Sequence, residues 1–141
     1  MRYLIDTCIF TTYVTDIDSL SRDALAIIED YDNTICMSAE SIRELIVSFN
    51  NGEIVSKVWD SAHHMIDAIL NEFCITVLPL KEEHMYTYSD LRLNVSMKHK
   101  DPSDHIIISH AITERLPLLS SDSKFDFYKD QGLDFIYTPK R

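Results

Sequence analysis

The stretch KHKDPSDHIIISHA, residues 98–111, predicts a buried helix with two aspartates at its start. Asp101 stands directly before a proline, where the N-cap of a helix is expected. Asp104 lies on the same helical face as Ile107 and Ile108, so its carboxylate is expected to point toward the core. A buried charge without a partner is costly. The stretch therefore predicts a function for Asp104 as well as a helix.

On both sides of this helix, short apolar runs alternate with helical patterns. This alternation predicts an α/β fold, a single domain over residues 1–141 with a mostly parallel central sheet of about five strands and helices on both faces. The expected strands are 3–6, 34–38, 74–78, 116–121 and 133–137, and the expected helices are 21–31, 39–49, 55–73, 81–95, 102–115 and 123–130.

Composition favours a globular protein of the cytoplasm. Hydrophobic residues make up 45% of the 141 residues, yet no stretch approaches the ~18 apolar residues of a membrane span. The three cysteines are odd in number, widely spaced and set in apolar runs. They are interpreted as buried thiols in a reducing compartment, and not as a disulfide framework or a zinc site.

The net charge of −10 argues against a general nucleic-acid coat, because binding phosphate requires positive surface. The charge is uneven, however: residues 1–80 carry 13 acidic and 4 basic side chains, whereas residues 81–141 carry 10 and 9. Any polyanion is therefore expected to meet the second half of the chain.

Four acids stand at the ends of predicted elements: Asp6, Glu44, Asp104 and Asp122. In a parallel sheet, ligands bind outside the carboxyl ends of the strands, and all four can converge there. Gathered carboxylates repel one another unless a cation lies among them, and oxygen ligands favour Mg²⁺ or Mn²⁺. Such a centre serves phosphoryl transfer by metal-activated water. The ordinary alternatives are a turn for Asp6, an N-cap for Asp122, a solvated surface for Glu44 and, for Asp104, the N3 position of an acidic capping box that begins at Asp101.

Further candidates surround these acids. The hydroxyls of Thr7 and Ser121 could hold a carboxylate or a water, and Glu40 is interpreted as solvated surface first and as a metal-shell residue second. The most basic local stretch holds Lys98 and Lys100, which together with Arg92 could bind the phosphates of a polyanion. A charged surface loop is the equally weighted alternative.

These motifs resemble the PIN-domain family, in particular the VapC-type toxin ribonucleases of toxin–antitoxin modules. The segments that carry the resemblance are LIDT with Asp6, SAESIREL with Glu44, DPSDHIIISHA with Asp104 and LPLLSSDSKF with Asp122. The resemblance spans nearly the whole chain. It implies a Mg²⁺- or Mn²⁺-dependent endoribonuclease, a homodimer, RNA as substrate and a cognate antitoxin that blocks the site.

Two positions depart from the family pattern. Ser103 stands where a bulky apolar residue is common, and His105 stands where arginine is frequent, so that a phosphate contact by His105 would be weaker and pH-dependent. The alternatives that remain open are a housekeeping PIN-domain RNA-processing nuclease and a non-catalytic relative that binds RNA or a partner. A response-regulator-like module is disfavoured, because 74–80 supplies no aspartate.

Overall fold

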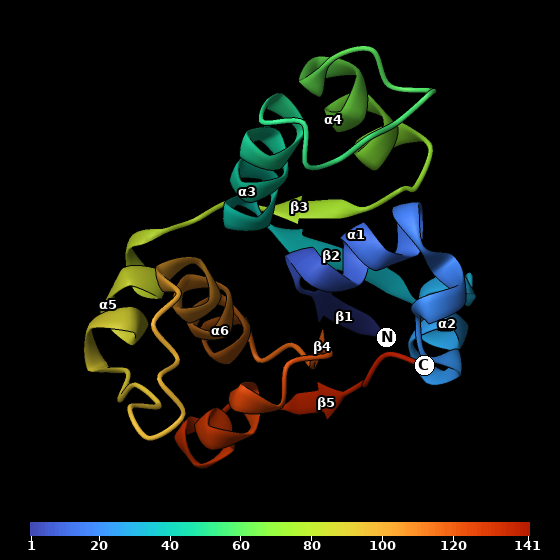
Figure 1. Cartoon of the computed structure of the whole chain (residues 1–141). Coiled ribbons are helices and arrows are strands. Elements are labelled where there is room, and N and C mark those ends of the chain that lie inside the picture. Colours follow the sequence, from blue (N-terminus) through green and yellow to red (C-terminus); the bar gives the residue numbers. More distant parts are fainter.

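Five parallel strands form one sheet in the order β3-β2-β1-β4-β5 in the computed structural model, which describes residues 1–141. The sheet grows outward from β1 on one side as far as β3, and the chain then crosses to the other side of β1 to add β4 and β5 (Figure 1). The predicted parallel sheet is confirmed. The strands are β1 (Arg2–Ile5), β2 (Thr34–Ser38), β3 (Thr76–Leu78), β4 (Leu118–Ser120) and β5 (Phe135–Tyr137).

Helices connect the strands and cover both faces of the sheet, as the sequence predicts. The α-helices α5 and α6 pack against each other (Figure 1). The helical elements are α1 (Thr7–Thr15), η1 (Ile17–Ser19), α2 (Arg22–Glu29), α3 (Ala39–Asn50), α4 (Ala62–Asn71), α5 (Glu82–Asp90), α6 (Pro102–Glu114) and η2 (Ser123–Gln131). None of the helices is both long and apolar enough to cross a membrane.

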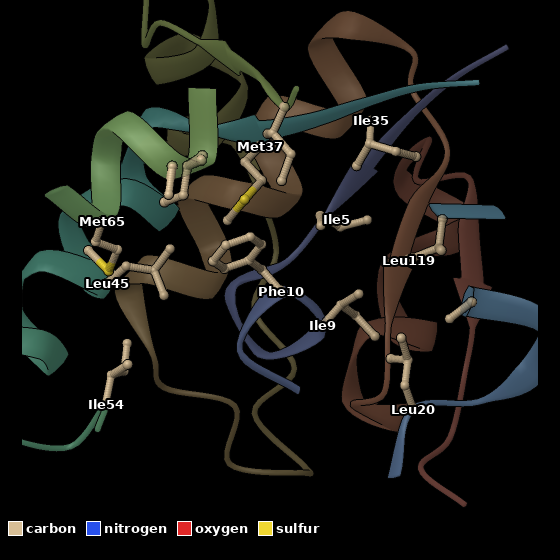
Figure 2. Packing of buried hydrophobic residues seen from close by; sticks show 14 of the residues in the cluster. Ile5, Ile9, Phe10, Leu20, Ile35, Met37, Leu45, Ile54, Met65 and Leu119 are labelled. Atoms are coloured by element: carbon tan, nitrogen blue, oxygen red, sulfur yellow. The ribbon is translucent and has the colours of Figure 1, made fainter. Parts of the chain in front are cut away.

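Alternation along the strands divides the core into two layers, because successive side chains of a strand point to opposite faces. Ile5 belongs to the layer under α1, α2, α3 and α4, where Phe10 lies at the centre of the packed side chains (Figure 2). Leu4 belongs to the opposite layer, where Ile107 and Ile108 of α6 pack with side chains of η2. Burial on both faces fixes the strand ends in space.

Strand ends pass directly into capped helices. Asp6 follows β1 and caps α1, and Ser38 ends β2 and caps α3. The predicted caps Ser21 of α2 and Asp101 of α6 are confirmed, since both side chains accept a hydrogen bond from a backbone N–H of the first helical turn. These caps position the polar residues that follow each strand.

The helix α1 is a difference from the sequence expectation. The segment TCIFTTYVT contains six β-branched residues, which are poor helix formers, and no helix is predicted there. The cap at Asp6 and the burial of Ile9 and Phe10 against the sheet outweigh this propensity.

The prediction of one long helix over 55–73 is wrong for the first part of this range. Helix α4 begins only after Ser61, and Val55 and Val58 are 82% and 69% exposed, so they are not part of a buried stripe. The Ser56 hydroxyl accepts the N–H groups of Val58 and Trp59, which holds this segment in a turn. Similarly, α5 ends at Asp90, short of the expected 95.

Two of the three cysteines also differ from expectation. Cys8 and Cys74 are exposed, and only Cys36 is buried. Cys8 lies in α1, a helix that the sequence does not predict, and Cys74 has a positive φ of 54° two residues before β3.

The shorter α4 can be tested by comparing two alanine substitutions within the expected stripe. Ile69 is fully buried in α4, so Ile69→Ala is expected to lower the free energy of unfolding by about 2–5 kcal/mol. Val55→Ala is expected to change it by less than about 0.5 kcal/mol. Urea denaturation followed by circular dichroism measures both, and similar losses for the two variants would contradict the structure.

Candidate functional site

One polar pocket of about 640 Å³ opens at the carboxyl ends of β1 and β4, where the strand order reverses. Crevices at this position of an open parallel sheet commonly bind ligands. The pocket collects side chains from α1, α3, the loop before α6, α6, η2 and the C-terminal segment. Its lining contains all four acids singled out in the sequence, namely Asp6, Glu44, Asp104 and Asp122.

Asp6 is the most buried of these acids, at 4% exposure. Its Oδ1 atom accepts the N–H of Ile9 at 2.8 Å, so the residue is at once a helix cap and part of the pocket. The pKa of Asp6 is raised from 3.8 to about 7, mainly by burial and also by the charges of Asp104 and Asp122, although hydrogen bonds from Ser120 and Ile9 oppose the rise. Asp6 is therefore a carboxyl that gives up its proton reluctantly when no cation is near.

Asp104 enters the pocket from the first turn of α6. Its Oδ2 atom lies 3.0 Å from Nε2 of His99. Burial raises its pKa from 3.8 to about 7, and the charges of Asp101, Glu44 and Asp122 add to the effect. The inward direction predicted from the helical spacing is confirmed by this position.

Glu44 reaches the pocket from α3 and is held by Thr7. The Thr7 hydroxyl donates to Oε1 of Glu44 at 2.6 Å, so the carboxylate it holds is on α3 and is not that of its neighbour Asp6. The sequence does not predict α1, and it therefore does not predict this hydrogen bond between α1 and α3 either. The bond fixes the direction of Glu44, which a solvated surface position would leave free.

Asp122 has two roles, as a cap and as a pocket residue. Its Oδ1 atom accepts the N–H of Lys124 at 2.9 Å, which starts η2. The hydroxyl in this region belongs to Ser120, which accepts the N–H of Asp122 and contacts Asp6. Neither Ser120 nor Ser121 lines the pocket, but Ser120 hydrogen-bonds to Asp6. The supporting hydroxyl expected at Ser121 is therefore that of Ser120. Side chains alternate along β4, so the Ser120 side chain points to the same face of the sheet as that of Leu118.

Glu40 is neither solvated nor part of the pocket lining. It is 7% exposed and accepts hydrogen bonds from Arg43, at 2.7 Å, and from the Ser103 hydroxyl, at 3.2 Å. The preferred interpretation as solvated surface is wrong because α6 packs over this end of α3. Ser103, the small residue where the family pattern has a bulky one, leaves room for the Glu40 carboxylate.

Of the basic candidates, Lys98 and Lys100 line the pocket. Arg92 does not; it pairs with Asp130 at 3.3 Å on the surface. The expected phosphate contact of His105 is also wrong, because its ring is buried and its Nε2 atom lies 3.0 Å from the carbonyl oxygen of His99.

Two lysines that the sequence did not single out complete the rim of the pocket. Lys124 follows the cap residue Asp122 by two positions, and Lys140 is brought over by the segment after β5. The spacing from Asp122 could have identified Lys124. Lys140 depends on the path of the C-terminal segment, which the sequence pattern does not reveal.

His99 is a further site residue that sequence reasoning missed. One ligand atom from each of His99, Asp104 and Asp122 lies within 4.8 Å of the others. Burial lowers the pKa of His99, with the charge of Asp122 opposing the change. The only signal in the sequence is its place in the basic stretch five residues before Asp104.

The donor set fits a divalent cation. Carboxylate oxygens dominate the pocket, and they suit hard divalent ions. The raised pKa values of Asp6 and Asp104 reflect burial and the charges of other acids. A cation among them would reverse this effect, because opposite charge favours the ionised carboxyl.

A second cluster, made of His84, His110 and Glu114, is explained without a cation. Nδ1 of His84 accepts the N–H of Lys81 at 2.8 Å, so the proton of the neutral ring is on Nε2, which donates to Glu114 at 2.8 Å. No lone pair of His84 remains for a metal. These contacts fasten the start of α5 to α6.

Comparison with known proteins agrees with this architecture. A family model described as PIN domain matches residues 3–130. No curated protein sequence matches the chain.

Solved structures with the same fold cover nearly the whole chain at low identity. VapBC2 from Rickettsia felis, bound to a DNA fragment from its promoter, has a TM-score of 0.72 at 21% identity, covering 98% of this chain and 99% of that one. VapBC-1 from nontypeable Haemophilus influenzae has a TM-score of 0.68 at 18% identity, covering 97% and 98%. VapBC-5 from Mycobacterium tuberculosis, of the VapBC family of toxin–antitoxin systems, has a TM-score of 0.61 at 16% identity, covering 98% of both chains.

The raised pKa values predict how the stability of the metal-free protein depends on pH. Between pH 3.8 and about 7 the folded state retains the protons of Asp6 and Asp104, whereas the unfolded chain has released them. The folded state therefore binds more protons, and the free energy of unfolding falls as the pH rises through this window. Thermal unfolding in EDTA from pH 4 to pH 8 measures this loss.

Asp6→Asn is expected to flatten that pH profile and to raise the melting temperature at pH 8 in EDTA. Asparagine keeps the oxygen that caps α1 but removes the buried charge. Asp30→Asn, at an exposed aspartate that also accepts a backbone N–H, is the matched control and should follow the wild type. Parallel profiles for Asp6→Asn and the wild type would contradict the electrostatic account.

Proposed function

The chain belongs to the PIN-domain family, and we propose that it is a Mg²⁺- or Mn²⁺-dependent endoribonuclease that hydrolyses RNA phosphodiester bonds. PIN domains are generally nucleases that use divalent metal ions. The observation that carries the proposal is the convergence of Asp6, Glu44, Asp104 and Asp122, from four separate segments, on one pocket. In this proposal residues 1–141 act as one nuclease domain.

The four acids would hold the cation. When bound, a divalent ion would supply an acidified water as nucleophile and would neutralise the charge that develops on the phosphate. Asp6 and Asp104 would release their protons as the cation enters, because their pKa values near 7 belong to the metal-free pocket. Thr7 would keep Glu44 directed into the pocket during this change.

The lysines at the rim would hold the RNA. Lys98, Lys100, Lys124 and Lys140 surround the acids, whereas the protein as a whole carries a charge of −10. Phosphate contacts of this kind position a nucleic-acid backbone without reading its sequence. Polyanion binding would thus be confined to the pocket.

We further propose that the chain is the VapC-type toxin of a toxin–antitoxin pair. Support comes from similar structures described as toxin–antitoxin systems or complexes. The proposed partners are a cognate antitoxin that covers the pocket and a second copy of the chain in a homodimer. RNA as the substrate would place the activity in the cytoplasm.

Asp104→Asn is expected to reduce the rate of metal-dependent RNA cleavage at least ~100-fold, the equivalent of about 2.7 kcal/mol of activation free energy. The measurement is cleavage of total cellular RNA with Mg²⁺ or Mn²⁺, compared with EDTA. Asp126→Asn, an exposed aspartate of η2 outside the pocket, is the control and should retain the wild-type rate. Cleavage that survives in EDTA or in Asp104→Asn would refute the proposed chemistry.

Expression of the wild-type chain is expected to arrest bacterial growth, and co-expression of the adjacent small open reading frame is expected to relieve the arrest. Asp6→Asn should be harmless when expressed alone. Robust RNA cleavage without growth arrest would instead favour a housekeeping RNA-processing nuclease. Metal binding without any cleavage would favour a non-catalytic relative.

A further inference from the structure

His99 lies beside the acids on a rigidly held loop. Its ring is 3% exposed, and ring centroids of Phe125 and Tyr128 lie 5.4 and 5.6 Å from it. The backbone N–H of His99 donates to the carbonyl oxygen of Asn94, and Lys98 immediately before it has a positive φ of 54°. A non-glycine residue in that conformation is held by its surroundings, so the direction of the His99 ring is set by the fold.

The Nε2 atom of this ring faces the carboxylates. It lies 3.0 Å from Oδ2 of Asp104, and the three ligand atoms of His99, Asp104 and Asp122 fit within 4.8 Å of one another. One ion could therefore contact all three atoms after small side-chain shifts.

The partner of the other ring nitrogen permits the tautomer in which Nε2 can act as a ligand. Nδ1 lies 3.0 Å from the hydroxyl of Tyr128, which can donate or accept a hydrogen bond. With the ring proton on Nδ1 and directed to the Tyr128 oxygen, the lone pair of Nε2 points at the pocket. This is the arrangement that His84 lacks, because a backbone N–H occupies its Nδ1.

We propose that His99 is a nitrogen ligand of the metal centre, alongside Asp104 and Asp122, and that it gives the centre a preference for Mn²⁺ over Mg²⁺. The inference rests on the proposed function only in assuming a divalent ion in this pocket. Mg²⁺ prefers oxygen ligands and retains its waters, whereas imidazole binds transition ions well. Tyr128 is then a positioning residue that selects the ring tautomer.

Pulsed electron paramagnetic resonance of the Mn²⁺-loaded protein tests the ligand directly. Coupling of the Mn²⁺ electron spin to ¹⁴N is expected in the wild type and should disappear in His99→Gln. The side-chain amide of glutamine can donate an N–H to Asp104, so loss of the coupling would not reflect mere displacement of the carboxylate. His63→Gln, at a largely exposed histidine outside the pocket, is the control and should retain the coupling.

Isothermal titration calorimetry with Mn²⁺ and Mg²⁺ measures the preference. In His99→Gln the affinity for Mn²⁺ is expected to fall at least ~10-fold, with a much smaller change for Mg²⁺. Equal losses for the two ions, or none, would overturn the inference. Should His99→Gln fail to fold, the wild-type spectrum decides, since the absence of ¹⁴N coupling there also overturns it.

The two proposals can fail separately. RNA cleavage with Mn²⁺ by a wild-type protein that shows no ¹⁴N coupling would refute the role of His99 and leave the nuclease proposal intact. A Mn²⁺ spectrum with ¹⁴N coupling in a protein that never cleaves RNA would refute the nuclease proposal alone.

Discussion

Repulsion among acidic side chains that the fold does not allow to separate is the constraint on which this structure depends. The core packs on both faces of the sheet, so the ends of β1 and β4 cannot move apart, and Asp6 and Asp122 remain together. Helix α6 adds Asp104 from its first turn. The result is a pocket whose free energy improves when a proton or a cation enters it.

The sheet was predictable because its strands are short apolar runs buried on both sides. β2, over residues 34–38, has the bounds expected from its sequence. β3, β4 and β5 lie within the expected runs, and β1 begins and ends one residue earlier than expected. Helix α1 was not predictable, because its β-branched residues favour strands, and only the cap at Asp6 and tertiary burial make it helical. The opposite error, a helix predicted where none forms, arose at Val55 and Val58. Their spacing fits a helix, but their side chains have no surface to pack against.

The four acids were identifiable because each stands at an element end that a parallel sheet brings to one edge. His99 was not, because its place depends on long-range contacts: the N–H of Asn94 donates to the Tyr128 hydroxyl, and the side-chain amide of Asn94 donates to the carbonyl oxygen of Lys124. The burial of Glu40 has the same origin, since it needs Ser103 from another helix. Local patterns identify residues at element ends, but they do not reveal which loop closes over them.

Asp6 and Asp122 are both pocket residues and helix caps, and this double use links the pocket to the backbone. In each carboxylate the Oδ1 atom accepts a backbone N–H, that of Ile9 or of Lys124, and both residues line the pocket. A ligand that binds the second oxygen of either carboxylate reduces the negative charge on the first oxygen, and it therefore weakens the hydrogen bond that caps the helix. The first turns of α1 and η2 would therefore report occupancy through altered amide exchange, without any domain motion.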